Sequence, residues 1–240
     1  MVEAEALFPV VLDDVSVYRK QTRVLGPLNI RFEQTGCTVL MGPNGAGKTT
    51  FLRLLHGLVR PREGKVVWAL PPEQTYARQS FVFQTPIVMR RTVQDNIAYP
   101  LIVRGAGKRQ GRQQADEWID RVGLAHVAHK DAGVISGGER QKLALARALI
   151  TAPDVLFLDE PSTNLDGAST RDIEALIQAV VRDGTRVFLA THDLGQARRL
   201  ADNILFIHHG AILEHAECDA FFDHPATPEA RSFLRGDILL

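Results

Sequence analysis

The sequence has no excess of charge of one sign and very little cysteine. Its 28 Lys and Arg residues balance its 28 Asp and Glu residues. No net field therefore draws the chain to nucleic acid or acidic lipid, and we expect no nucleic-acid partner. Its two cysteines, Cys37 and Cys218, are far apart and show no CxxC or Cys/His spacing. This argues against a disulfide framework or a zinc site and favours a reducing compartment.

Long apolar runs are also missing. No stretch approaches the ~18 apolar residues of a membrane-spanning helix, and the start of the chain, MVEAEALFPVVLDD, carries acids where a signal peptide is basic. We therefore expect a chain that neither spans a membrane nor is exported. The composition, 45% hydrophobic and 23% charged in 240 residues, is typical of a soluble protein with a sizeable core.

Hydrophobic periodicity predicts an α/β fold. Short alternating runs in FPVVLDDVSVY and RVLGPLNIRFE predict strands near the N-terminus, and GKVVWAL and QSFVFQ predict two more on either side of a proline-rich loop at Pro71 and Pro72. Later strands in DVLFLDE, TRVFLAT and NILFIHHGAILEH alternate with helices, as in a largely parallel sheet covered on both faces. We predict one domain over residues 1–240, with a core in 1–84 and 135–216, a helical lobe in about 85–134 and a helical tail in about 217–240.

The segment GPNGAGKT matches the pattern G-x-x-x-x-G-K-[ST] and lies between a predicted strand, TVLM, and a predicted helix. In such a loop backbone N–H groups converge on phosphate oxygens, while Lys48 reaches the β- and γ-phosphates and Thr49 can bind Mg²⁺. A glycine-rich turn without a ligand is the weaker alternative. The residues that we assign to the nucleotide here are Gly42, Pro43, Asn44, Gly45, Ala46, Gly47, Lys48, Thr49 and Thr50. The loop alone indicates only a nucleotide, because kinases, GTPases and motors share it.

Polar side chains follow three predicted strands. In VLFLDEP, Asp159 is expected to bind Mg²⁺ and Glu160 to orient the attacking water. His192 follows a neighbouring strand and is expected to contact the γ-phosphate and Glu160. Gln84 is expected to contact Mg²⁺ or its water. The alternatives are a turn cap before Pro161, a structural histidine and an ordinary polar strand end.

The segment ISGGERQK raises a separate question. Ser136 and Glu139 have the spacing of a capping box at the start of a helix. That explains neither Gly137 nor Gly138, because a glycine inside a helix costs about 1 kcal/mol relative to alanine. We therefore expect another group to approach the backbone closely at these glycines.

The chain resembles, over nearly its whole length, the nucleotide-binding subunit of an ATP-binding cassette transporter. The resemblance rests on these segments and residues, in this order: GPNGAGKT, Gln84, ISGGERQK, VLFLDEP, NLD (Asn164 to Asp166) and His192. The resemblance implies a P-loop NTPase core with an N-terminal antiparallel β-subdomain, a mixed or parallel main sheet and an inserted α-helical subdomain. It also implies that ATP and Mg²⁺ bind and that ATP is hydrolysed.

The same resemblance implies a head-to-tail homodimer. Ser136, Gly137 and Gly138 of one subunit, with Glu139 beside them, would contact the γ-phosphate held by the other subunit. Tyr18 would stack on the adenine, and Asp166 would connect the two sites across the dimer. The sequence departs from the family pattern where Ile135 replaces leucine and Glu139 replaces glutamine.

The resemblance favours an importer subunit at the cytoplasmic face of the membrane, with separate permeases that receive solute from an extracytoplasmic binding protein. An exporter subunit and a soluble assembly or translation factor are alternatives. DNA-repair cassettes are disfavoured because only a short lobe separates Gln84 from Ile135.

A permease helix is suited to bind the segment QTPIVMRRTVQDNIAYPLIVRG. For Ile97, Leu101 and Ile102 of this segment, however, we expect a place in the interior of the lobe. The segment QTPIVMRRTVQDNIAYPL and the tail FFDHPATPEARSFLRGDILL resemble those of tungstate-type oxyanion importers; molybdate, phosphate and amino acids stay open.

Overall fold

The computed structural model describes residues 6–163 and 165–237. Its strands are β1 (Val10–Arg19), β2 (Thr22–Phe32), β3 (Cys37–Met41), β4 (Glu63–Trp68), β5 (Gln79–Val82), β6 (Val155–Asp159), β7 (Arg186–Ala190), β8 (Asn203–His208) and β9 (Ala211–Glu217). Its helices are α1 (Lys48–His56), α2 (Pro72–Ala77), α3 (Val93–Val103), α4 (Lys108–Arg121), η1 (Ala125–Val127, 3-10), α5 (Gly137–Leu149), α6 (Gly167–Arg182), α7 (Leu194–Leu200), α8 (Cys218–Asp223) and α9 (Pro228–Arg235).

The strands form two sheets. β2, β1 and β4 make an antiparallel sheet, and the larger sheet has the order β5-β6-β7-β3-β8-β9. Neighbours from β5 to β8 are parallel, and β9 is antiparallel to β8. β3, β6 and β7 are buried at every position, as expected for strands covered on both faces. The predicted α/β fold, with an N-terminal antiparallel sheet and a mixed main sheet, is confirmed.

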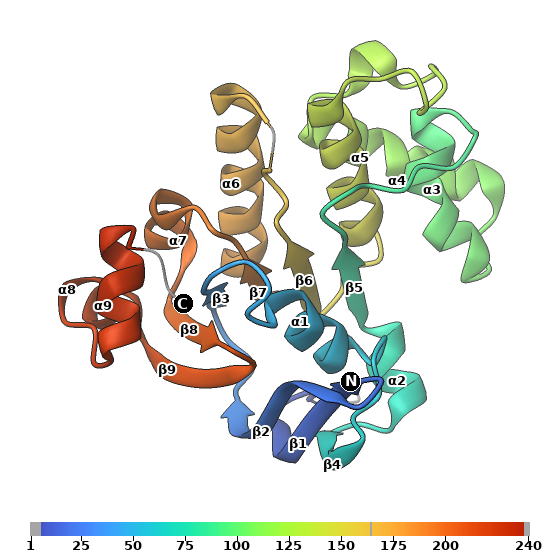
Figure 1. The fold of residues 1–240 in the computed structure, drawn as a ribbon. Coiled ribbons are helices and arrows are strands. Elements are labelled where there is room, and N and C mark those ends of the chain that lie inside the picture. Colours follow the sequence, from blue (N-terminus) through green and yellow to red (C-terminus); the bar gives the residue numbers. More distant parts are fainter. Residues whose placement is uncertain (1–5, 164, 238–240) are drawn as a thin grey trace.

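Helix α1 lies between the two sheets, as Figure 1 shows. Its side chains Phe51 and Leu52 are fully buried and belong to one apolar cluster with Leu25 of β2 and with Phe157 and Phe188 of the main sheet. The helix ends at Gly57 in the left-handed conformation, as its sequence predicts. Packing on both sides fixes the start of α1, and with it the segment that precedes Lys48.

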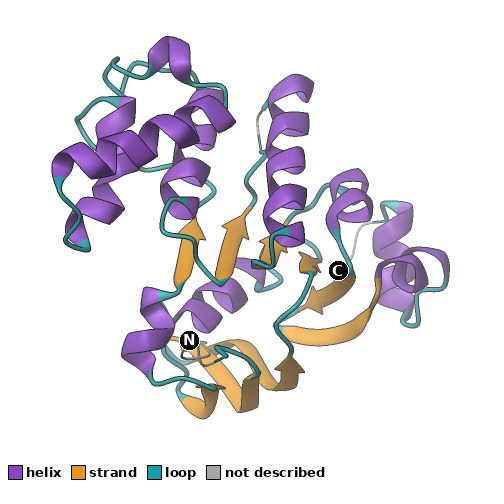
Figure 2. Ribbon diagram, turned by 180° about the vertical axis from the view of Figure 1, so that it is seen from behind, coloured by secondary structure: helices purple, strands orange, loops and turns teal. Residues whose placement is uncertain are grey.

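A helical arm made of α3, α4, η1 and the first part of α5 extends away from both sheets; Figure 2 shows it as a group of helices with no strand among them. It has its own apolar cluster, which includes Ile97 and Leu143. Ile97 is fully buried, and Leu101 and Ile102 pack against the cluster, so the expected interior role of these residues is confirmed. Among the described residues, no helix is both long and apolar enough to cross a membrane.

Two local predictions are wrong. The proline-rich stretch is not only a loop, because α2 begins at Pro72. Proline fits the first position of a helix, where its missing N–H has no partner to lose. In addition, β5 ends at Val82, so Gln84 lies two residues beyond the strand that it was expected to end. Gln84 therefore sits in a connecting segment between β5 and the helical arm.

Candidate functional site

The phosphate-binding segment follows β3 and leads into α1. At Gly42 a side chain is excluded, since φ is 142° and a Cβ atom would lie 2.0 Å from the Ile207 carbonyl oxygen. At Gly47 φ is 115°, and this residue precedes α1 with no side chain capping the helix. The first N–H groups of α1 therefore remain available to an anion, with the positive end of the helix dipole behind them.

A pocket of about 650 Å³ opens over this segment. Among the residues lining it are Asn44, Gly45, Ala46, Gly47, Lys48, Thr49 and Thr50, together with Gln84, Glu160 and His192. The structure thus brings together most of the residues that motif and strand-end position predict. Arg19, Val24 and Thr163 also line it, and sequence reasoning missed them. Arg19 could have been predicted, because it directly follows Tyr18, which was assigned to the adenine.

Lys48 is 6% exposed and lies across its own loop. Its Nζ donates to the carbonyl oxygens of Gly42 at 2.7 Å and Pro43 at 3.0 Å. Burial lowers the pKa of Lys48, an effect opposed by the nearby Glu160 and Asp159 carboxylates. An ammonium group has three donors, so one beyond these two carbonyls can serve a phosphate oxygen.

Thr49 and Asp159 form the floor of the site. Thr49 Oγ1 donates to Asp159 Oδ1 at 2.8 Å, and Asp159 is 3% exposed. Burial raises the pKa of Asp159, while the hydrogen bond from Thr49 lowers it. A buried carboxylate beside a hydroxyl oxygen fits Mg²⁺, which prefers oxygen ligands and takes one or two from protein. Among the described residues, no group of three or more His, Cys, Asp or Glu residues is arranged to hold a metal.

Glu160 contacts two other predicted residues, Gln84 and His192, as well as Thr163. It follows β6 with φ at 47°, a conformation that a residue other than glycine adopts only under constraint, and its N–H donates to the Ala190 carbonyl at 2.9 Å. Its Oε2 accepts from Gln84 Nε2 at 3.1 Å and from Thr163 Oγ1 at 2.9 Å. His192 Nδ1 lies 3.3 Å from the same oxygen. Three side chains therefore contact one oxygen of this carboxylate at the pocket.

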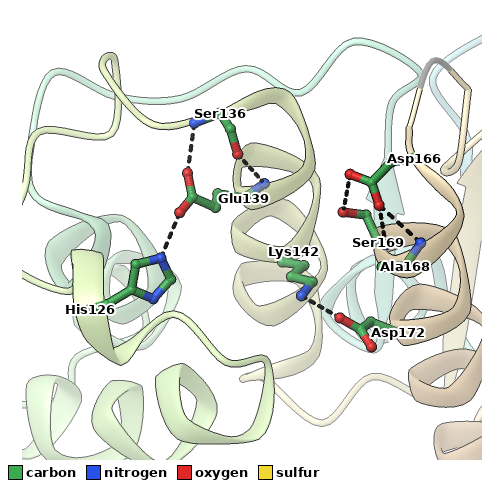
Figure 3. Close-up of polar contacts among 8 residues, drawn as sticks. All are labelled: His126, Ser136, Glu139, Lys142, Asp166, Ala168, Ser169 and Asp172. Atoms are coloured by element: carbon green, nitrogen blue, oxygen red, sulfur yellow. Dashed lines mark hydrogen bonds and ion pairs between the residues drawn. The ribbon is translucent and has the colours of Figure 1, made fainter.

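The predicted capping box is confirmed at the start of α5. Ser136 Oγ accepts from the Glu139 N–H at 3.2 Å, and Glu139 Oε2 accepts from the Ser136 N–H at 2.7 Å, as Figure 3 shows. Glu139 Oε1 lies 2.8 Å from His126 Nε2. The hydrogen bonds from Ser136, aided by His126, lower the pKa of Glu139. Glu139 completes the cap as an ionised carboxylate.

The two glycines of this segment differ. A Cβ atom at Gly138 would lie 2.8 Å from Ser169 Oγ, so α6 of the same chain makes the close approach there. A Cβ atom at Gly137 would meet nothing within 4 Å among the described residues. The expectation of a close neighbour is thus met within the chain at Gly138, while Gly137 faces outward.

The ISGGE segment does not line the pocket over the phosphate-binding loop. Figure 1 shows α5 in the helical arm, apart from α1 at the centre of the molecule. Within one chain, Ser136, Gly137, Gly138 and Glu139 are therefore not brought to the residues around Lys48.

Tyr18 and Asp166 also lie outside the pocket lining. The Tyr18 hydroxyl donates to the Glu63 carboxylate at 3.3 Å, and the Arg62 guanidinium lies 5.0 Å from the centre of its ring. Asp166 caps α6: one oxygen accepts from the N–H groups of Ala168 at 2.9 Å and Ser169 at 2.8 Å. These hydrogen bonds, led by those from Ser169, lower the pKa of Asp166. Asn164, the first residue of NLD, lies outside the described residues.

Comparison with known proteins agrees with this geometry. The sequence profile described as ABC transporter matches residues 25–163. A probable anion import ATP-binding protein of Haloferax volcanii is 37% identical over 238 residues, 90% of this chain and 83% of the relative. The tungstate uptake system ATP-binding protein TupC of Peptoclostridium acidaminophilum is 38% identical over 201 residues, 83% of this chain and 92% of the relative.

Other relatives are named as ATP-binding proteins for phosphate import, glutamate transport and sulfate/thiosulfate import. Among solved structures, the dimeric ATP-binding cassette MJ0796, bound to ADP and Pi in a post-hydrolysis state, matches with a TM-score of 0.77 and 27% identity. The match covers 87% of this chain and 98% of that one.

Proposed function

Because this chain belongs to the ABC transporter family and is an ATPase of that family, we propose that it powers the import of an oxyanion through separate membrane permeases. The observation that carries its role in hydrolysis is the contact of Gln84, Thr163 and His192 with one oxygen of Glu160. That carboxylate lies in the same pocket as Lys48 and the start of α1.

Several groups in and beneath the pocket are given roles in phosphoryl transfer. The free N–H groups at the start of α1 and the Lys48 ammonium bind the β- and γ-phosphates. Thr49 and Asp159 would hold Mg²⁺, which supplies positive charge to offset that of the phosphates. Glu160 orients a water in line with the γ-phosphate, and His192 keeps the Glu160 carboxylate in place. Catalysis then rests on positioning and charge rather than on a covalent intermediate.

A second copy of the chain is proposed to complete the site. Support comes from Gly137, which faces outward, and from Ser136, which caps α5 away from the loop of its own chain. In a head-to-tail pair these residues would meet the γ-phosphate bound by the partner, and Asp166 would lie between the two sites. The related cassette MJ0796 is itself dimeric.

The permease is proposed to bind a groove of about 470 Å³ between β5, α3 and α5. Its lining includes Phe83, Ile87 and Val103, of which Ile87 is 70% exposed and Val103 65%. Arg104 and Arg147 also line it. An amphipathic helix with an apolar face and an acidic edge fits such a groove. We therefore propose that the chain works at the cytoplasmic face of the membrane, bound through the permease.

For the solute we propose an oxyanion such as tungstate or molybdate. The support is the likeness to relatives named for anion and tungstate uptake. The pocket described above serves the nucleotide, so the choice of solute belongs to the permease and to an extracytoplasmic binding protein. Phosphate and amino acids, for which other relatives are named, are the competing solutes.

The test is capture of the Glu160→Gln protein, with ATP and Mg²⁺, from gently solubilised membranes of the source organism. A permease recovered together with a solute-binding protein is the expected result, and a Lys48→Ala, Glu160→Gln protein is the control that should capture less. The recovered binding protein is then titrated with tungstate, molybdate and phosphate. Recovery of soluble partners alone would overturn the transport role, and tight binding of phosphate or an amino acid instead would overturn the proposed solute.

A further inference from the structure

The ISGGE segment carries a full negative charge at the place where it is proposed to meet a triphosphate. Both oxygens of Glu139 are used within its own chain: Oε2 accepts from the Ser136 N–H at 2.7 Å, and Oε1 lies 2.8 Å from His126 Nε2. An ionised carboxylate can only accept hydrogen bonds, so His126 Nε2 must carry the hydrogen of this contact. The side chain of Glu139 is 23% exposed and that of His126 is 64% exposed.

The two basic residues of α5 that follow Glu139 in the sequence, Arg140 and Lys142, have other partners. Arg140 donates to the carbonyl oxygens of Ile135 at 3.1 Å and Gly133 at 3.0 Å. Lys142 pairs with Asp172 of α6 at 2.6 Å, and Figure 3 shows this pair on the side of α5 opposite His126. Of Arg140, Lys142 and His126, the residue whose side chain contacts the Glu139 carboxylate is His126.

Packing of the helical arm determines where His126 lies. It is the middle residue of η1, between Leu124, which is fully buried, and Val127, which is 3% exposed. The Ala128 carbonyl accepts from the Gln94 N–H at 3.0 Å, which ties this segment to α3. The backbone on both sides of His126 is thus anchored, and the imidazole is directed at the N-terminus of α5.

We propose that His126 is a positioning residue for the ATP-bound dimer: by binding Glu139 Oε1 it holds this carboxylate against its own chain and away from the partner's triphosphate. Ser136 and Gly137 are then the groups that the segment presents. This rests on the proposed function, in which the segment contacts ATP bound to a second copy.

The test measures ATP-dependent dimerisation of Glu160→Gln protein by its concentration dependence in sedimentation. In that background, His126→Ala should raise the dimer dissociation constant. One exposed pair changes an equilibrium by up to about fivefold, and two such sites per dimer make the limit about twenty-fivefold. His126→Gln, which keeps an N–H donor at the same reach, should restore most of the loss. ATP affinity of the monomer should not change.

Two further variants separate this role from general destabilisation. In a Glu139→Gln background, His126→Ala should have no effect on dimerisation, because the carboxylate that it positions is gone. His129→Ala, at an exposed position three residues along, is the matched control. An equal effect of His126→Ala in both backgrounds, or none in either, would refute the role of His126. If the Glu160→Gln parent itself fails to dimerise with ATP, the dimer proposed above is wrong, and this inference with it.

Discussion

Thr49 Oγ1 and Asp159 Oδ1 lie 2.8 Å apart although 110 residues separate them in the sequence. The contact joins the start of α1 to the end of β6 beneath the pocket. Burial raises the pKa of Asp159 although the Thr49 hydrogen bond and the charges of Arg53 and Lys48 oppose it, so the charged carboxylate is costly to the fold. The pair therefore has the properties of a site kept for function rather than for stability.

Replacing Asp159 with Asn should separate its contribution to ATPase activity from its effect on stability. We expect ATPase activity with Mg²⁺ to fall by about a hundredfold or more, since even supporting groups around a metal change activity ten- to a hundredfold. The free energy of unfolding should stay equal or rise, because a neutral amide of the same shape replaces a buried charge. Phosphate release across a Mg²⁺ titration and urea unfolding without nucleotide measure the two effects. Asp183→Asn, at an exposed carboxylate, is the control, and retained activity would remove Asp159 from the metal site.

Replacing Glu160 with Gln should abolish turnover while leaving ATP binding intact. The amide keeps the shape of the side chain but cannot act as a base toward water, an effect of about a hundredfold or more. ATP should then accumulate in a stable dimer, visible as an earlier peak in gel filtration that disappears when Mg²⁺ is chelated. Hydrolysis by the variant at the parent rate would assign the attacking water to another residue.

The two glycines of the ISGGE segment should respond differently to alanine. Gly138→Ala places a Cβ atom 2.8 Å from Ser169 Oγ, so the Ser169 side chain or the packing of α5 on α6 must shift and the melting temperature should fall. Ser169→Gly should restore it. Gly137→Ala meets open space in the chain and should leave the melting temperature nearly unchanged, yet reduce ATPase activity if the partner's phosphate lies there. Equal melting temperatures for both variants would show that the contact with Ser169 is not tight.

Much of the site is predictable from sequence because its parts are local. A phosphate loop is defined by the order of its own residues. Asp159 ends β6, Glu160 follows it and His192 follows β7, and these parallel neighbours end at the same edge of the sheet. Contacts between distant segments leave no such pattern. The approach of Ser169 to Gly138 depends on how two helices pack, and the contact of His126 with Glu139 depends on η1, a turn with no apolar period of its own.

His56 is the last residue of α1 and packs edge-on against Phe81 and Phe157, with each ring centre 5.6 Å away. Its Nδ1 is buried and has no hydrogen-bond partner among the described residues. Burial lowers the pKa of His56 below its usual value. The folded protein therefore prefers the neutral imidazole, whereas the unfolded chain binds a proton at the ordinary pKa of about 6.5.

The sign of the resulting pH dependence follows from linkage. Between the lowered pKa of folded His56 and about 6.5, the unfolded state binds more protons, so the free energy of unfolding falls as the pH falls. His215 and His208, whose pKa values burial also lowers, act in the same direction. His56→Leu should therefore reduce, but not abolish, the loss of stability between about pH 7.5 and about pH 5.5. Urea unfolding at both pH values measures this loss of stability. Because the loss is the difference between the two pH values, any packing change that is the same at both cancels. A slope equal to that of the parent protein would mean that buried His56 accepts its proton without cost to the fold.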